Sequence, residues 1–140
     1  LARAARGSMG RALATDIESY RARREAMLAV LQALALTPDR VRLLRASEEL
    51  NDPKRKDDYE QSLDVLETLV RDVWATRLGG RGGQVVNEDL RSQLTKIGER
   101  VESARAAGWL LRIEGLRGQL AFNVNRKVAA DALLLGMAGA

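Results

Sequence analysis

The sequence contains no cysteine and no histidine, and each absence excludes a class of site. Without cysteine there is no disulfide bridge, no thiolate nucleophile and no cysteine ligand for zinc. Without histidine there is no Ser-His-Asp triad and no imidazole ligand for a metal ion. Catalysis would have to rest on carboxylates, lysine, arginine or tyrosine. The adjacent acidic residues lie at expected helix ends, where they favour capping, so we expect no catalytic residue and no metal site.

Aromatic residues and prolines are scarce as well. Aromatics make up 4% of the 140 residues and hydrophobic residues 46%, so Leu, Val and Ala must build most of the core. Only two prolines are present, and no long alternation of apolar and polar residues indicates a strand. We predict an all-α domain built as a bundle of five to six helices.

Long apolar runs are also missing. No run approaches the roughly 20 residues that a membrane-spanning helix needs, and no signal peptide opens the chain. We therefore expect a cytoplasmic protein without a membrane partner.

Basic residues outnumber acidic ones by a small margin. The net charge of +4 is compatible with a nucleic-acid partner. However, charges of both signs are interspersed, and no aromatics alternate with the basic residues as stacking platforms, which favours a solvated helix surface. A basic helical nucleic-acid-binding domain stays open as an alternative. Its cations would be Arg21, Arg23, Arg24, Lys54, Arg55 and Lys56.

The stretch from Asp57 to Leu78 predicts a central helix. Its apolar residues recur at steps of three and four, and further apolar residues flank them, so the apolar arc is broad. A helix with such an arc is usually buried against several neighbours at once. Gly79 and Gly80 are expected to end it. The arc consists of Tyr59, Leu63, Val65, Leu66, Leu69, Val70, Val73 and Trp74.

Apolar stripes predict further helices around the central one. They cover residues 17–35, 38 to about 50, 87 to about 101, 103–122 and 127–137. The expected N-caps, from residue type and position, are Thr37, Asn87, Ser103 and Asn125. Residues 1–6 resemble the end of an earlier helix, which Gly7 would terminate before Ser8 caps the next. The stripe of the short second helix is expected to use Val41, Leu44 and Leu50.

Some of the glycines cluster in a predicted connector, and others lie inside a predicted helix. Residues 79–83 contain four glycines, which favours a connector, because a phosphate-binding loop would continue with Gly-Lys-Ser/Thr. Gly108, Gly115 and Gly118 should each cost the helix predicted over 103–122 up to ~1 kcal/mol relative to alanine. Either a neighbour packs closely against this helix, or the helix is broken.

Several residues are candidates for contacts with a partner. Arg71 and Asp72 lie in the middle of the central helix. They form either a surface ion pair or a contact with a partner. Trp74 and Trp109 are anchors of a core or of an interface. The final helix is apolar nearly all round, Leu134 included, so its own bundle or another subunit must cover it.

Three segments, in this order, resemble one protein family. Residues 7–13 (GSMGRAL) resemble the lid subdomain of bacterial clamp-loader ATPases of the AAA+ class. Residues 69–74 (LVRDVW) resemble the Arg-Asp helix in the C-terminal domain of the delta-prime subunit. Residues 123–125 (NVN), with the Leu-rich helix that follows, resemble the end of that subunit. The sequence is thus similar to the C-terminal part of a DNA polymerase III delta-prime subunit.

The resemblance implies both a domain organisation and a function. Residues 1–15 would end the lid subdomain, and residues 16–140 would form a helical collar domain. Collar domains join delta-prime to the gamma/tau and delta subunits in a hetero-pentamer, which loads the sliding clamp onto primed DNA during replication. The family implies subunit assembly, not catalysis, for this part of the protein. A gamma/tau-type collar is the alternative within the same family.

The resemblance also suggests roles for individual residues. Arg11 matches the sensor-2 position, which reaches toward the phosphates of a bound nucleotide, although Met9 replaces the usual proline. The phosphate-binding loop is not in this sequence, so we expect no cofactor here. The interface candidates are Arg71, Asp72, Trp74, Asn123, Asn125 and Leu134.

Overall fold

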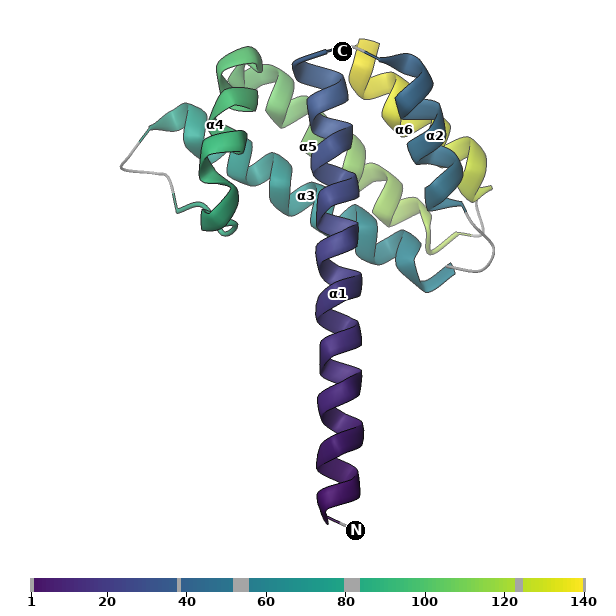
Figure 1. Cartoon of the computed structure of the whole chain (residues 1–140). Helices are drawn as coiled ribbons and strands as arrows, with labels where there is room; N and C mark the ends of the chain where they lie inside the picture. Colours follow the sequence, from purple (N-terminus) through teal and green to yellow (C-terminus); the bar gives the residue numbers. More distant parts are fainter. Residues whose placement is uncertain (1, 38, 52–55, 80–83, 123–124, 140) are drawn as a thin grey trace.

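The computed structural model describes residues 2–37, 39–51, 56–79, 84–122 and 125–139; for residues 2–13, 56 and 57 it describes the backbone alone. These residues form six α-helices and one turn of 3₁₀-helix, and no strand occurs among them, which confirms the all-α prediction (Figure 1). The elements are α1 (Ala2–Ala35), α2 (Arg40–Leu50), α3 (Lys56–Leu78), η2 (Glu88–Leu90), α4 (Arg91–Arg100), α5 (Ser103–Gln119) and α6 (Arg126–Gly139).

Helix α1 is a single helix whose first half projects from the bundle (Figure 1). The expected end at Gly7 is wrong, because the helix continues through this residue. Alanine, arginine, leucine and methionine around Gly7 are strong helix formers, and together they outweigh the cost of about 1 kcal/mol for one glycine. Residues 14–22 are exposed, and the first buried side chain is Met27. The predicted boundary between residues 15 and 16 falls inside α1 and stays a prediction.

Helix α3 is the centre of the bundle, as its broad apolar arc predicts. It packs against α1, α2, α4 and α5. Leu63, Leu66 and Val70 have exposed fractions of 0%, while Trp74 at the end of the arc is partly buried. Gly79 ends the helix with a φ of 79°, a left-handed conformation that favours glycine. The rest of the predicted glycine connector, residues 80–83, lies outside the described residues.

Helix α2 begins later than its start pattern predicts. Asp39 is the N-cap, and its carboxylate accepts a hydrogen bond of 3.1 Å from the backbone nitrogen of Arg42. Thr37 is therefore not the cap. The expected stripe is also largely wrong, because Val41 and Leu44 are 62% and 44% exposed. The residues of α2 that are buried are Leu43, Ser47 and Leu50, a stripe rotated around the helix from the expected one.

The predicted stripes of α4 and α5 are confirmed, but their N-caps are not. Ile97 on α4 and Trp109 on α5 are both 0% exposed. Asn87 precedes η2 without a side-chain capping bond, and Ser103 is the first residue of α5 rather than its cap. Gly108, Gly115 and Gly118 neither break α5 nor contact a neighbour: a Cβ atom on any of them would have no atom within 4 Å.

Helix α6 starts where its cap predicts and lies beside α2 and α5 (Figure 1). The side-chain oxygen of Asn125 accepts a hydrogen bond of 3.2 Å from the backbone nitrogen of Val128. Only one side of this apolar helix is covered. Leu133 and Leu134 are buried, whereas Val128 and Leu135 are 61% and 40% exposed.

Candidate functional site

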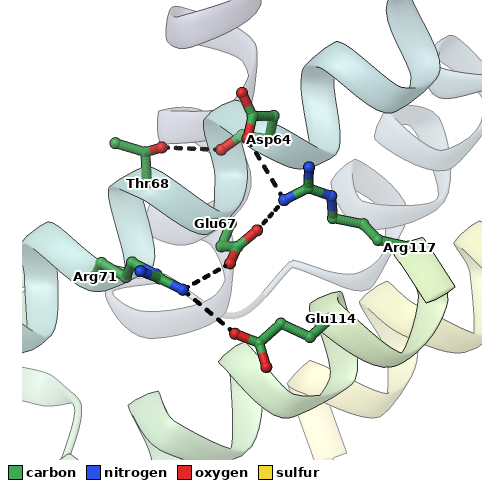
Figure 2. A network of polar contacts seen from close by, with 6 residues as sticks. All are labelled: Asp64, Glu67, Thr68, Arg71, Glu114 and Arg117. Atoms are coloured by element: carbon green, nitrogen blue, oxygen red, sulfur yellow. Dashed lines mark hydrogen bonds and ion pairs between the residues drawn. The ribbon is translucent and has the colours of Figure 1, made fainter.

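Arg71 does not pair with Asp72; it belongs to a network of charges between α3 and α5 (Figure 2). Its guanidinium lies 3.0 Å from the carboxylate of Glu67 and 3.3 Å from that of Glu114. Arg117 of α5 binds the second oxygen of Glu67 and lies 3.4 Å from Asp64. The side chain of Glu67 is only 10% exposed, and two cations compensate the cost of burying it. The network therefore holds α5 against α3.

Asp72 has a structural role inside the domain. Its carboxylate accepts hydrogen bonds from the backbone nitrogen of Val86 at 2.8 Å, the backbone nitrogen of Asn87 at 3.0 Å and the side-chain nitrogen of Asn87 at 2.7 Å. With an exposed fraction of 2%, it presents almost no surface to a partner. Sequence reasoning missed this role; the signal that could have found it is an acidic residue within the apolar arc of α3, since a buried carboxylate needs hydrogen-bond donors.

Asn87 links this anchor to α1. Its side-chain oxygen accepts a hydrogen bond of 3.3 Å from Arg24, which also donates to both oxygens of Asp89 at 3.0 and 2.7 Å. The hydrogen bond from Arg24 lowers the pKa of Asp89. Polar contacts thus run from α3 through Asn87 to the half of α1 that packs on the bundle.

Two of the basic residues of the nucleic-acid alternative are paired within the domain. Arg23 pairs with Asp58 at 2.8 Å, and Arg24 pairs with Asp89. The side chain of Lys56 is not described, and residues 54 and 55 lie outside the described residues. These pairs compensate two of the six cations, and the nucleic-acid alternative stays a prediction.

The remaining interface candidates lie in different environments. Leu134 is buried in the core at 1% exposure, and Asn125 caps α6. The indole nitrogen of Trp74 is buried and has no hydrogen-bond partner among the described residues. Asn123 lies outside the described residues, and Arg11 lies in α1 without a described side chain. The predicted candidates therefore do not gather on one exposed surface, and their interface role stays a prediction.

A second polar cluster, which the sequence did not predict, joins α2, α3 and α6. The hydroxyl of Tyr59 donates a hydrogen bond of 2.8 Å to the carbonyl oxygen of Arg126, whose guanidinium lies 5.3 Å from the centre of the tyrosine ring. Burial raises the pKa of Tyr59 to about 12. The hydroxyl of Ser47 donates to the carboxylate of Asp131. These contacts fix the start of α6 on the bundle.

The described part of the chain contains neither a group of three metal-ligating side chains nor a helix that is long and apolar enough to cross a membrane. Several ion pairs join different helices, among them Arg23–Asp58, Arg71–Glu114 and Arg117–Glu67. Two large apolar side chains are exposed as well: Leu111 is 70% exposed and Phe122, in the turn after α5, is 78% exposed.

Residues 21–138 match a family model described as DNA polymerase III, delta subunit, C terminal. The chain belongs to this family. It is therefore a C-terminal domain of a clamp-loader subunit of DNA polymerase III, as the resemblance indicates, although the matched family is that of delta and the resemblance pointed to delta-prime. No curated protein and no solved structure matches the chain.

Proposed function

We propose that this domain is a collar module, which joins neighbouring subunits of the bacterial DNA polymerase III clamp loader through exposed faces of its helices. The observation that carries the proposal is the apolar surface on α5 and α6, where Leu111, Val128 and Leu135 are 70%, 61% and 40% exposed. Removing such side chains from water favours association by roughly 25 cal/mol for each Å² buried.

The projecting half of α1 supports a second role, that of a connector to a nucleotide-binding module. Ile17 and Tyr20 are 51% and 42% exposed on this half, and another protein surface can cover them. In this proposal residues 1–15 end an AAA+ lid, and Arg11 acts as a sensor-2 cation, since phosphates are bound by positive charge. The domain itself holds no cofactor.

The subunit identity is part of the proposal. The resemblance of residues 7–13, 69–74 and 123–125 supports delta-prime, whereas the matched family is described as that of delta, and a gamma/tau collar is the third possibility. The three identities can be distinguished with clamp loaders that are reconstituted without delta-prime, without delta or without gamma/tau. The full-length protein should restore clamp loading only to the preparation that lacks the subunit to which it corresponds.

The assembly function is tested by light scattering. Within a ring each subunit uses two different patches, so the protein should be monomeric alone and should form complexes with the gamma/tau and delta-type subunits. A tight homodimer, or the failure to bind any clamp-loader subunit, would contradict the proposal.

Titration of the isolated domain with ATP and Mg²⁺ should show no heat, whereas micromolar binding would mean that it carries a complete nucleotide site.

A further inference from the structure

The three glycines of α5 face open space rather than a neighbouring helix. A Cβ atom on Gly108, Gly115 or Gly118 would have no atom within 4 Å. Together with Leu111, which is 70% exposed, they recur at steps of three and four and so lie on one side of α5. Each glycine weakens the helix relative to alanine, and no contact within the described chain requires it.

Helix α6 carries a similar outward stripe. Val128, Ala132 and Leu135 recur at steps of four and three, and all three are exposed. Val128 and Leu135 are among the exposed large hydrophobic residues, at 61% and 40%. This stripe lies opposite the side of α6 that is buried in the bundle.

Helices α5 and α6, which carry the two stripes, pack side by side. The helices run antiparallel, because the indole nitrogen of Trp109 near the start of α5 donates a hydrogen bond of 3.0 Å to the carbonyl oxygen of Met137 near the end of α6. Arg112 lies against Gly136: a Cβ atom on Gly136 would be 2.5 Å from the guanidinium. The two outward stripes therefore lie on neighbouring helices, and together we call them the α5–α6 outer face.

Arg112 gives this face a positive charge. Among the described residues it is in no ion pair, whereas Arg117 on the other side of α5 is paired with Glu67 and Asp64. A second copy of the chain would bring the same cation, and like charges that face each other across an interface oppose association. The charge is complementary to a carboxylate on a different protein.

We propose that the α5–α6 outer face receives an α-helix of another clamp-loader subunit, one with bulky aliphatic side chains that lie over the glycines and a carboxylate that binds Arg112. The inference rests on the proposed collar function and identifies its surface. Glycine positions let a second helix approach closely, because the distance between packed helices depends on the side chains at the contact. Leu111 and Leu135 supply the apolar area on either side of this contact, and Arg112 sets the orientation of the incoming helix.

The first test adds a side chain where the partner helix would lie. Gly115→Leu in the full-length subunit should weaken binding to the partner subunit at least tenfold in surface plasmon resonance. Because the position is open in the free domain, the midpoint of thermal unfolding should not fall. Gln93→Leu, which adds a leucine to the exposed side of α4, is the matched control and should bind like the wild type. Wild-type affinity of Gly115→Leu would overturn the proposal.

The second test concerns the charge. Arg112→Glu should reduce the affinity at least tenfold, Arg112→Lys should retain most of it, and Arg112→Ala should make binding less sensitive to salt. Tighter binding by Arg112→Glu would mean that the partner surface is basic, which contradicts the proposed carboxylate.

The outcomes separate this inference from the collar function on which it rests. If the wild-type subunit binds no clamp-loader partner, the collar function itself fails. If it binds but Gly115→Leu and Arg112→Glu bind equally well, only the assignment of the α5–α6 outer face is wrong. Val41→Glu changes an exposed apolar residue of α2 and should have no effect; a loss there alone would place the surface on α2. A homodimer that Gly115→Leu disrupts would identify a second copy as the occupant and overturn the proposal.

Discussion

Asp72 on α3 binds Asn87 through two separate hydrogen bonds, one from its backbone nitrogen at 3.0 Å and one from its side-chain nitrogen at 2.7 Å. Both residues are buried, with exposed fractions of 2% and 5%. The pair joins the end of the first three helices to the start of the last three. A mid-helix carboxylate thus acts as the anchor for a chain segment that follows it by fifteen residues.

This anchor can be tested by truncation. Asp72→Ala leaves the backbone donors of Val86 and Asn87 without their acceptor, and we expect a loss of roughly 1.5–3 kcal/mol in the free energy of unfolding, the range for hydrogen bonds to charged groups. Urea denaturation followed by circular dichroism measures it. Glu60→Ala, at an exposed residue of the same helix, is the control and should change the value by less than about 0.5 kcal/mol. Equal effects of the two substitutions would show that the anchor contributes little.

The position of α3 at the centre of the core leads to a second prediction. Leu66 is 0% exposed, so Leu66→Ala should lower the free energy of unfolding by ~2–5 kcal/mol through lost burial and the cavity that remains. Leu111→Ala removes the same atoms from a side chain that is 70% exposed and should cost less than roughly 0.5 kcal/mol. Chemical denaturation of both variants gives the comparison, and a small effect at Leu66 would contradict the central position of α3.

Two helical glycines should respond to alanine in opposite directions. Gly115→Ala adds a methyl group in open space and should stabilise the domain by up to ~1 kcal/mol. Gly98→Ala should destabilise it, because the new Cβ would lie 2.6 Å from the hydroxyl of Thr76 and 3.2 Å from the carbonyl oxygen of Val73. The test is the free energy of unfolding of each variant, measured against that of the wild type. A loss of stability in Gly115→Ala would mean that α5 has a close neighbour within the chain.

The buried phenol of Tyr59 predicts a dependence of stability on alkaline pH. Burial raises its pKa to about 12 from the usual value of 10.0, so between these pH values the folded state keeps a proton that the unfolded state has released. The contribution of this group to stability is therefore complete below pH ~10 and is lost as the pH rises toward ~12. Tyrosinate absorbance in a Tyr20→Phe variant, where Tyr59 is the one tyrosine left, measures the pKa directly. A titration midpoint near 10 would show that the phenol is accessible to solvent.

The sequence predicted those parts of the fold that depend on local pattern. The apolar arc of α3, the stripe of α5 and the cap at Asn125 are each encoded within a few helical turns, where periodicity and residue type act directly. The continuity of α1 through Gly7 was not predicted, because single-residue stop signals were weighted above the helix formers around them. The buried side of α2 was missed because it contains Ser47, a polar residue that binds Asp131, so residue type alone favoured Val41 and Leu44 instead.

Local sequence patterns could not predict the polar contacts. Asp72 meets Asn87, and Tyr59 meets Arg126, over separations of 15 and 67 residues, and no spacing rule connects such pairs. The glycines of α5 were recognised as costly, but their open surroundings are known only once the packing of α5 and α6 is known. Candidates chosen for an interface, such as Asp72 and Leu134, lie in the interior, because a resemblance identifies positions in a family without their exposure.

The geometry of α1 makes it a lever arm. Its free part, from Ala2 to Ala22, is about 30 Å long at 1.5 Å per residue, and it leaves the bundle just before the ion pairs of Arg23 with Asp58 and Arg24 with Asp89. These two pairs attach the emerging helix to the start of α3 and to η2. A rotation of about 10° at this attachment displaces the far end by about 5 Å, so small changes in the bundle become movements large enough to open or close a contact at the other end.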